Sequence, residues 1–135
     1  MTTKLPSEGV DVTLNYIFQD AVASATNIMT PPGGGAGFKV PSGYKFHPVC
    51  LHGESDTDLT AGTITFKIFV DGVVANAYPS VVLSDTVQAA SSTQELHTEP
   101  VNQGSVVSVR ATANSGLTPS TCSLDAILVG VLLPA

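Results

Sequence analysis

Alternation of apolar and polar residues is the most regular feature of this sequence, and it predicts β-strands along most of the chain. The pattern is clearest at residues 62–70, where polar positions alternate with Ile64, Phe66, Ile68 and Val70. A period of two places successive side chains on opposite faces, so such a strand buries one face only. The Asp71-Gly72 pair that follows is a strong signal of a two-residue hairpin turn.

Further strands are predicted on the same grounds, separated by turns that contain glycine or proline. The strongest are residues 10–18 and 105–113, and residues 121–133, whose centre is apolar on both faces. Shorter or weaker strands are expected at 23–29, 38–40, 44–51, 81–83 and 94–98, with polar connections at 53–58 and 84–92. In the strand at 44–51, Pro48 lacks a backbone donor, so this strand is expected at a sheet edge or with a bulge. Regular alternation there would place on one face Tyr44, Phe46, Pro48 and Cys50.

About eight short strands joined by such loops predict an all-β fold, an antiparallel β-sandwich of the jelly-roll type. An immunoglobulin sandwich is disfavoured because the chain has no tryptophan, which that core places between its two cysteines. Residues 1–9 lack periodicity and contain Pro6 and Gly9. We therefore expect an extended N-terminal arm at 1–9, followed by a single domain at 10–135.

Composition supports a folded domain and excludes several classes of function. Hydrophobic residues make up 43% of the chain and charged residues only 12%, which argues against intrinsic disorder. The net charge of −6 leaves no basic surface for nucleic acid or an anionic membrane. The N-terminus lacks the pattern of a secretory signal, and the longest apolar run, 126–133, is far shorter than the roughly 20 residues of a membrane span. We expect a soluble chain.

Candidate metal and thiol chemistry is sparse. Carboxylates at Glu54, Asp56 and Asp58 have the spacing of a calcium loop but lack its central glycine and closing glutamate, so they form a weak calcium candidate and otherwise a solvated turn. His47 and His52 are five positions apart and are expected on opposite strand faces, which argues against a metal site with Cys50. Without an export signal, two buried thiols at Cys50 and Cys122 are favoured over a disulfide. No metal or cofactor is expected.

Catalytic patterns are also missing from the sequence. There is no Gly-x-Ser-x-Gly elbow, and the glycine-rich stretch 33–37 is not followed by the Lys-Ser/Thr of a phosphate loop. Tyr78 is the one aromatic ring expected at the surface, where it could contribute to carbohydrate binding or, more simply, plug one end of the sandwich. We therefore expect a protein that is not an enzyme.

The chain has more apolar residues than one thin sandwich needs to bury. They are concentrated at Ile127, Leu128, Val129, Val131, Leu132 and Leu133, and at Val73, Val74, Val81 and Val82. Association of identical chains would bury the surplus, so we expect a homo-oligomer, either a trimer or another closed ring.

Four stretches of the chain carry a resemblance to a known group of proteins. They are Tyr44-Lys-Phe-His-Pro-Val, residues 59–72 ending in Val-Asp-Gly, residues 103–110 and residues 125–130. Together they resemble the small jelly-roll modules of tailed-phage virions, over about residues 40–133. Such modules serve as head decoration (cement) proteins and as terminal domains of head or tail fibres. The chain departs from the usual pattern at Gly104-Ser105, where those modules have Gly-Asp.

The resemblance implies a structural virion protein, assembled in the host cytoplasm and bound as a homotrimer to the outer surface of a phage head. Its partners would be other copies of itself and the major capsid protein or another virion protein. Contacts with the shell or with neighbouring subunits are expected at Thr2, Lys4, Leu5, Pro6, Leu128, Val131 and Leu133. A receptor- or glycan-binding fibre or tail module is the alternative, and it predicts a pocket at loop ends such as 54–58 or 114–120.

Overall fold

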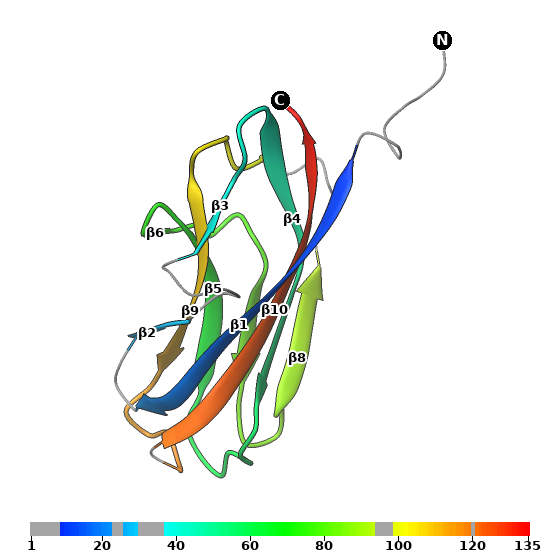
Figure 1. Ribbon diagram of the computed structural model, residues 1–135. Helices are drawn as coiled ribbons and strands as arrows, with labels where there is room; N and C mark the ends of the chain where they lie inside the picture. The colour runs from blue at the N-terminus through cyan, green and yellow to red at the C-terminus, as the bar shows by residue number, and fades with distance from the viewer. Residues whose placement is uncertain (1–8, 23–25, 30–36, 94–98, 120) are drawn as a thin grey trace.

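The computed structural model describes residues 9–22, 26–29, 37–93, 99–119 and 121–135, and the regular structure within them is entirely β-strand (Figure 1). The strands, in chain order, are β1 (Val10–Val22), β2 (Thr26–Ile28), β3 (Phe38–Lys39), β4 (Tyr44–Ser55), β5 (Ile64–Val70), β6 (Val73–Val74), β7 (Ser80–Leu83), β8 (Ala89–Thr93), β9 (Val106–Ala113) and β10 (Thr121–Pro134). Nothing in this described part forms a helix with the length and apolar character needed to cross a membrane.

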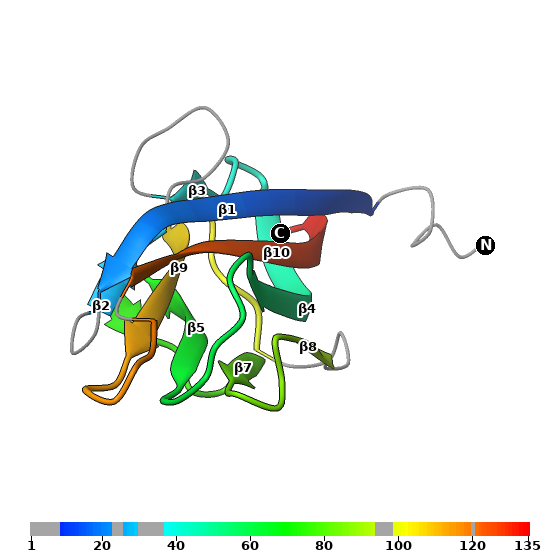
Figure 2. The same ribbon diagram turned by 90° about the horizontal axis from the view of Figure 1, so that it is seen from below.

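The strands form two antiparallel sheets that face each other. The four-stranded sheet has the order β1-β10-β4-β8, and the six-stranded sheet has the path β2-β9-β5-β6, with β3 also paired to β9 and β7 to β5. Figure 2 shows the two layers, with β1, β10 and β4 in one and β9, β5 and β7 in the other. Each sheet thus interleaves strands from the two ends of the chain. This is the strand order of a jelly roll, which confirms the predicted fold.

The core lies between the inner faces of the two sheets. Tyr16, Leu51 and Leu128 from the four-stranded sheet and Phe66 and Ile68 from the six-stranded sheet are all fully buried. Tyr16 links the two sheets by hydrogen bonding: its hydroxyl, on β1, donates to the Val107 carbonyl of β9 at 3.0 Å. Burial raises the pKa of Tyr16, an effect that a backbone hydrogen bond with Phe38 partly offsets.

Two glycines of the four-stranded sheet let phenyl rings lie directly on its backbone. A Cβ at Gly53 would come within 2.7 Å of the Phe66 ring, and one at Gly130 would overlap the Phe46 ring and lie 2.7 Å from the His47 carbonyl oxygen. Both glycines are buried. Only a residue without a side chain fits these positions as the core is packed.

The structure of β4 confirms one prediction, a bulge, and corrects three others. Val129 pairs with Cys50 and Gly130 with Pro48, so Val49 is an extra residue in the ladder. This is the bulge expected at Pro48, while the alternative of an edge position is wrong because β4 lies between β10 and β8.

The extra residue reverses the alternation of side chains in the second half of β4. Cys50 therefore lies on the outer face. The prediction that it shares a face with Phe46 and Pro48 is wrong. His47 and His52 lie on the same outer face, not on opposite faces, because an odd spacing across a bulge restores the same direction.

Several boundaries also differ from the predictions. Strand β4 continues to Ser55, into the expected loop at 53–58, and β8 occupies the end of the expected connection at 84–92. The hairpin at Asp71-Gly72 is confirmed, since both residues have the positive φ angles, 51° and 80°, that its tight turn requires. The predicted strand at 94–98 lies outside the described residues, as do positions 1–8 of the predicted N-terminal arm.

Candidate functional site

The outer face of the four-stranded sheet carries an apolar stripe along its central strand. This β10 stripe consists of Ile127, Val129, Val131 and Leu133, all half-buried. Its neighbours on β1 are Asp11, Thr13 and Asn15, and its register partners on β4 are Lys45, His47, Cys50 and His52. The stripe is thus bordered on both sides by polar side chains, as a contact surface with a polar rim would be.

The predicted contact residues have three different outcomes. Val131 and Leu133 belong to the β10 stripe and are accessible, and their contact with another chain remains a prediction. Leu128 is fully buried in the core, so its assignment to a contact surface is wrong; the alternation of β10 turns it inward. Thr2, Lys4, Leu5 and Pro6 lie outside the described residues.

The histidines and cysteines do not form a metal centre in the described residues, where no group of three His, Cys, Asp or Glu side chains could hold a metal ion. The Nδ1 atom of His52 lies 2.7 Å from the Ser91 hydroxyl, and its Nε2 atom lies 3.6 Å from the Glu54 carboxylate. Both cysteines are free thiols; Cys122 is buried as expected, but Cys50 is only half-buried. Burial is the main cause that raises the pKa of the Cys122 thiol.

The acidic stretch proposed as a weak calcium candidate is held as a turn. The Asp56 carboxylate accepts hydrogen bonds from the Ser123 backbone N–H at 3.0 Å and from the Thr57 hydroxyl at 3.2 Å. Glu54 lies on the outer sheet face near His52, and Asp58 is exposed. Asp56 thus serves to join this turn to the start of β10, and the three carboxylates do not converge on one point.

Two acidic residues lie side by side at one end of the same outer face. Asp125 of β10 pairs in register with Glu54 of β4, and on the other side of Asp125 is Ile17 of β1, which is 49% exposed. Residues directly opposite in an antiparallel pair have Cβ atoms about 5 Å apart, so these two carboxylates repel each other. We call Glu54 and Asp125 the acidic pair.

The outer face of the six-stranded sheet has the opposite arrangement. Lys67 of β5 pairs in register with Arg110 of β9, which places two cations side by side; we call them the basic pair. The Arg110 guanidinium lies over the Phe69 ring, 4.5 Å from its centre. A shallow hollow of about 410 Å³ adjoins them, lined by Thr65, Lys67, Phe69, Val74 and Thr112.

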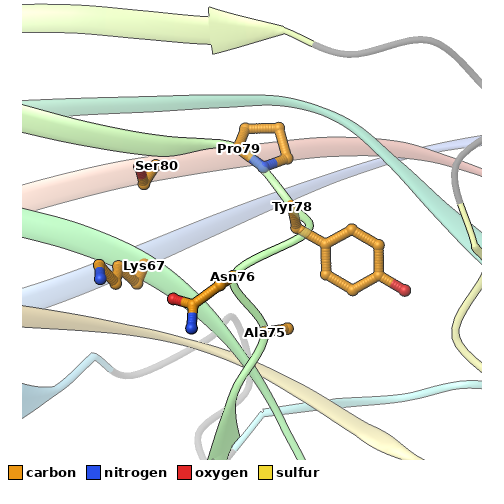
Figure 3. A pocket seen from close by; sticks show the side chains of 6 residues that line it. All are labelled: Lys67, Ala75, Asn76, Tyr78, Pro79 and Ser80. Carbon is orange, nitrogen blue, oxygen red and sulfur yellow. The ribbon is translucent and has the colours of Figure 1, made fainter.

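Tyr78 closes one end of the sandwich, in agreement with the simpler of its two interpretations. Its hydroxyl donates to the Glu99 carbonyl at 2.6 Å, and its ring packs against the core. Burial, and to a lesser extent the charge of Glu99, raise its pKa. Tyr78, Lys67 and Ser80 are among the residues that line a small hollow of about 40 Å³. The Tyr78 ring points away from the other two side chains (Figure 3). A second hollow of about 310 Å³ includes Tyr78, Asn76 and Asn102.

Neither charged pair follows from the sequence alone. Lys67 and Arg110 were both placed on the polar sides of their predicted strands, which was correct. What was missing was the pairing of β5 with β9, since an alternating pattern gives the face of a residue but not its cross-strand neighbour.

Comparison with known proteins finds likeness in the fold alone. No protein-family model matches the chain, and no curated protein matches it in sequence. A chain of the acidic stable capsid structure of Helicobacter pylori bacteriophage KHP30 matches with a TM-score of 0.55 and 14% identity, over 93% of this chain and 90% of that one. A chain of the cyanophage Pam1 capsid asymmetric unit matches with a TM-score of 0.55 and 16% identity, over 94% and 87%. This chain has a fold found in viral capsids.

A plant virus gives a third match, with lower similarity. The coat protein of Tobacco streak virus matches with a TM-score of 0.50 and 16% identity, over 99% of this chain and 92% of that chain. The fold therefore recurs in shells of phages and of a plant virus, and nearly the whole chain takes part in each match.

Proposed function

We propose that this protein is a structural component of a phage particle, and that it binds the outer surface of the head as a homotrimeric decoration, or cement, protein. The observation that supports this best is the likeness of the fold, over nearly the whole chain, to chains from two phage capsids. The accessible β10 stripe, with its polar border, supports a role in contacts with other chains.

The role would be mechanical. A chain that bridges neighbouring capsid subunits adds buried surface that must be exposed again before the shell can open. Each Å² of apolar surface contributes about 25 cal/mol, from which the entropic cost of binding is subtracted. Val131 and Leu133 would contribute from the stripe, and the predicted arm at residues 1–9 would contribute a second contact with the shell.

Binding to shells tests this proposal directly. Purified protein is mixed with heads assembled from the major capsid protein encoded near it, and the heads are then sedimented, imaged by electron microscopy and heated. We expect added density on the outer surface and a higher temperature of shell opening. A chain lacking residues 1–9 is the matched variant, and it should fold but bind less. Heads that neither bind the natural protein nor gain stability would contradict the proposal.

A receptor- or glycan-binding fibre module is the second candidate. It is supported by the 310 Å³ hollow at the end of the sandwich, where a tyrosine ring lies near the polar side chains of Asn76 and Asn102. Rings combined with amides are common in carbohydrate sites, because the ring stacks on the sugar and the amide bonds its hydroxyls. A glycan array probed with the natural chain and with Asn102→Ala would show binding that the variant loses; an array without signal would remove this candidate.

A further inference from the structure

Like charges face each other on both outer faces of the sandwich, with opposite sign on the two faces. Lys67 and Arg110 are register partners on the six-stranded sheet, and Glu54 and Asp125 are register partners on the four-stranded sheet. Like charges directly opposite in an antiparallel pair destabilise the isolated sheet. With a net charge of −6, the chain has only five cations, and two of them stand next to each other.

The basic pair also lacks an acidic partner within the part of the chain that the structure describes. Among the described residues, no carboxylate lies within ion-pair distance of Lys67 or Arg110, and the buried Nε atom of Arg110 has no hydrogen-bond acceptor. The Phe69 ring holds the guanidinium in place. A buried donor left without an acceptor is unfavourable.

We propose that these pairs are the two halves of one contact, in which the acidic pair of one copy binds the basic pair of the next copy. This deepens the proposed function, on whose self-association it rests. In the contact, the two like-charged pairs would become two opposed sets of charges. A carboxylate also suits the guanidinium particularly well, because the two groups can form parallel hydrogen bonds.

The apolar surroundings of the two pairs match each other as well. Ile17 lies beside the acidic pair and is 49% exposed, while Phe69 and Val74 line the hollow beside the basic pair. Val82, on the same outer face, is 50% exposed. A contact between these faces would therefore bury apolar surface around the charges, which strengthens charge pairs by removing water.

The contact joins different faces of two identical chains, so it is heterologous. Such contacts form a closed ring when the rotation between copies closes, and an open filament when it does not. A homotrimer, as proposed above, is the smallest ring that this contact can build by successive rotation around one axis.

Charge reversal on each face tests the contact. Lys67→Glu with Arg110→Glu makes both faces acidic, and Glu54→Lys with Asp125→Lys makes both faces basic. We expect each variant alone to self-associate at least about tenfold more weakly than the natural chain, because like charges would then face each other across the contact. Sedimentation at low and high salt measures this.

The chain that carries all four substitutions is the decisive control. It has the natural net charge of −6 but exchanges the sign of the two faces, so it should associate again. An equal mixture of the two reversed chains should also associate, but it must alternate, so it can close only into even-numbered rings. A trimer in the natural protein and an even-numbered or open assembly in the mixture would together establish a heterologous contact.

Failure of this contact and failure of the proposed function give different results. If the reversed chains associate like the natural chain, or if the fourfold variant does not recover, the contact is wrong while the virion role stands. If the natural chain is a monomer at all concentrations, the contact is also wrong, and binding to heads still decides the proposed function.

Loss of folding would mimic loss of association, so a milder pair of variants keeps the test sound. Lys67→Glu and Asp125→Lys leave Arg110 on Phe69 and Glu54 beside His52. Circular dichroism confirms folding of each single variant, and their double variant should recover association by the same logic.

Discussion

The two sheets differ in the regularity of their central strand pairs. Between β5 and β9, seven residue pairs run from Ile64↔Ala113 to Val70↔Val107 without interruption. Between β10 and β4, the ladder is longer but contains the bulge at Val49. The regular pair buries large side chains on its inner face and has no glycine, whereas the bulged pair has Gly53 and Gly130 beneath phenyl rings.

The difference shows how the sandwich obtains a close fit between its layers. A bulge increases the local twist and bends a strand, so the long strands β4 and β10 can follow the shorter sheet. Glycines on the bent sheet then receive rings from Phe66 on the opposite layer and from Phe46 on the same one. Irregularity is therefore confined to one layer, and the other layer remains a plain alternating ladder.

Deletion of a single residue from each pair should give the largest contrast. Removing Lys67 from β5 shifts Ile68 to the outer face, which alone loses about 1.5–3 kcal/mol, and it also disrupts the register with β9. We expect this chain not to fold cooperatively. Removing Val49 from β4 should cost only about 0.5–3 kcal/mol, because Phe46, Pro48 and Leu51 keep their faces when the ladder becomes regular. Denaturant unfolding measures the stability of both chains. Equal losses of unfolding free energy would show that Val49 is not the extra residue of the ladder.

Glycine substitutions test the close fit of the bulged sheet. Gly53→Ala and Gly130→Ala each introduce a Cβ too close to a ring, so we expect each to lose about 1–3 kcal/mol of unfolding free energy. Gly116→Ala is the control, because the nearest side-chain atom there is 3.8 Å away and the loop is exposed; it should change stability by less than about 0.5 kcal/mol. Unchanged stability in the first two variants would mean that the rings move aside without loss.

The hydrogen bond between the sheets can be tested by pH. Burial holds the pKa of Tyr16 above its ordinary value in the folded chain, so the phenol ionises first in the unfolded chain. The stability contributed by the neutral phenol is complete below about pH 10 and is lost as the pH rises further. Tyr16→Phe should lose about 1 kcal/mol at pH 8, because the bond to the Val107 carbonyl is removed. Between pH 8 and pH 10.5, the unfolding free energy of this variant should fall less than that of the natural chain. An equal fall in both chains would contradict this explanation.

The same contrast explains how far the sequence could predict the structure. The strand at Ile64–Val70, its hairpin and the inward positions Val107 and Val109 follow directly from alternation, because this ladder is unbroken. Proline signalled the bulge in β4, but its consequence for Cys50 and for the two histidines was missed. A pattern of period two gives correct faces only as long as each residue has one partner.

The candidate surfaces were less predictable than the fold. An excess of apolar residues indicated a contact surface, yet Leu128 belongs to the core, since both faces of a central strand are apolar for different reasons. The charged pairs depend on which strands are neighbours in the sheet. That information comes from the topology of residues more than 40 positions apart and leaves no local mark on the sequence.

The smallest expected effect distinguishes the two charged pairs within a single chain. Lys67→Gln removes the repulsion with Arg110, so the dilute monomer should gain about 0.2–1 kcal/mol at low salt. Asp125→Asn should gain less stability, because the polar His52 ring, 3.6 Å from the Glu54 carboxylate, already stabilises part of the acidic charge. Both gains should shrink in 1 M salt, where the screening length falls to about 3 Å. Unfolding at two salt concentrations measures them. A gain that is independent of salt would mean that Lys67 affects the sheet through its packing and that the basic pair is not under electrostatic strain.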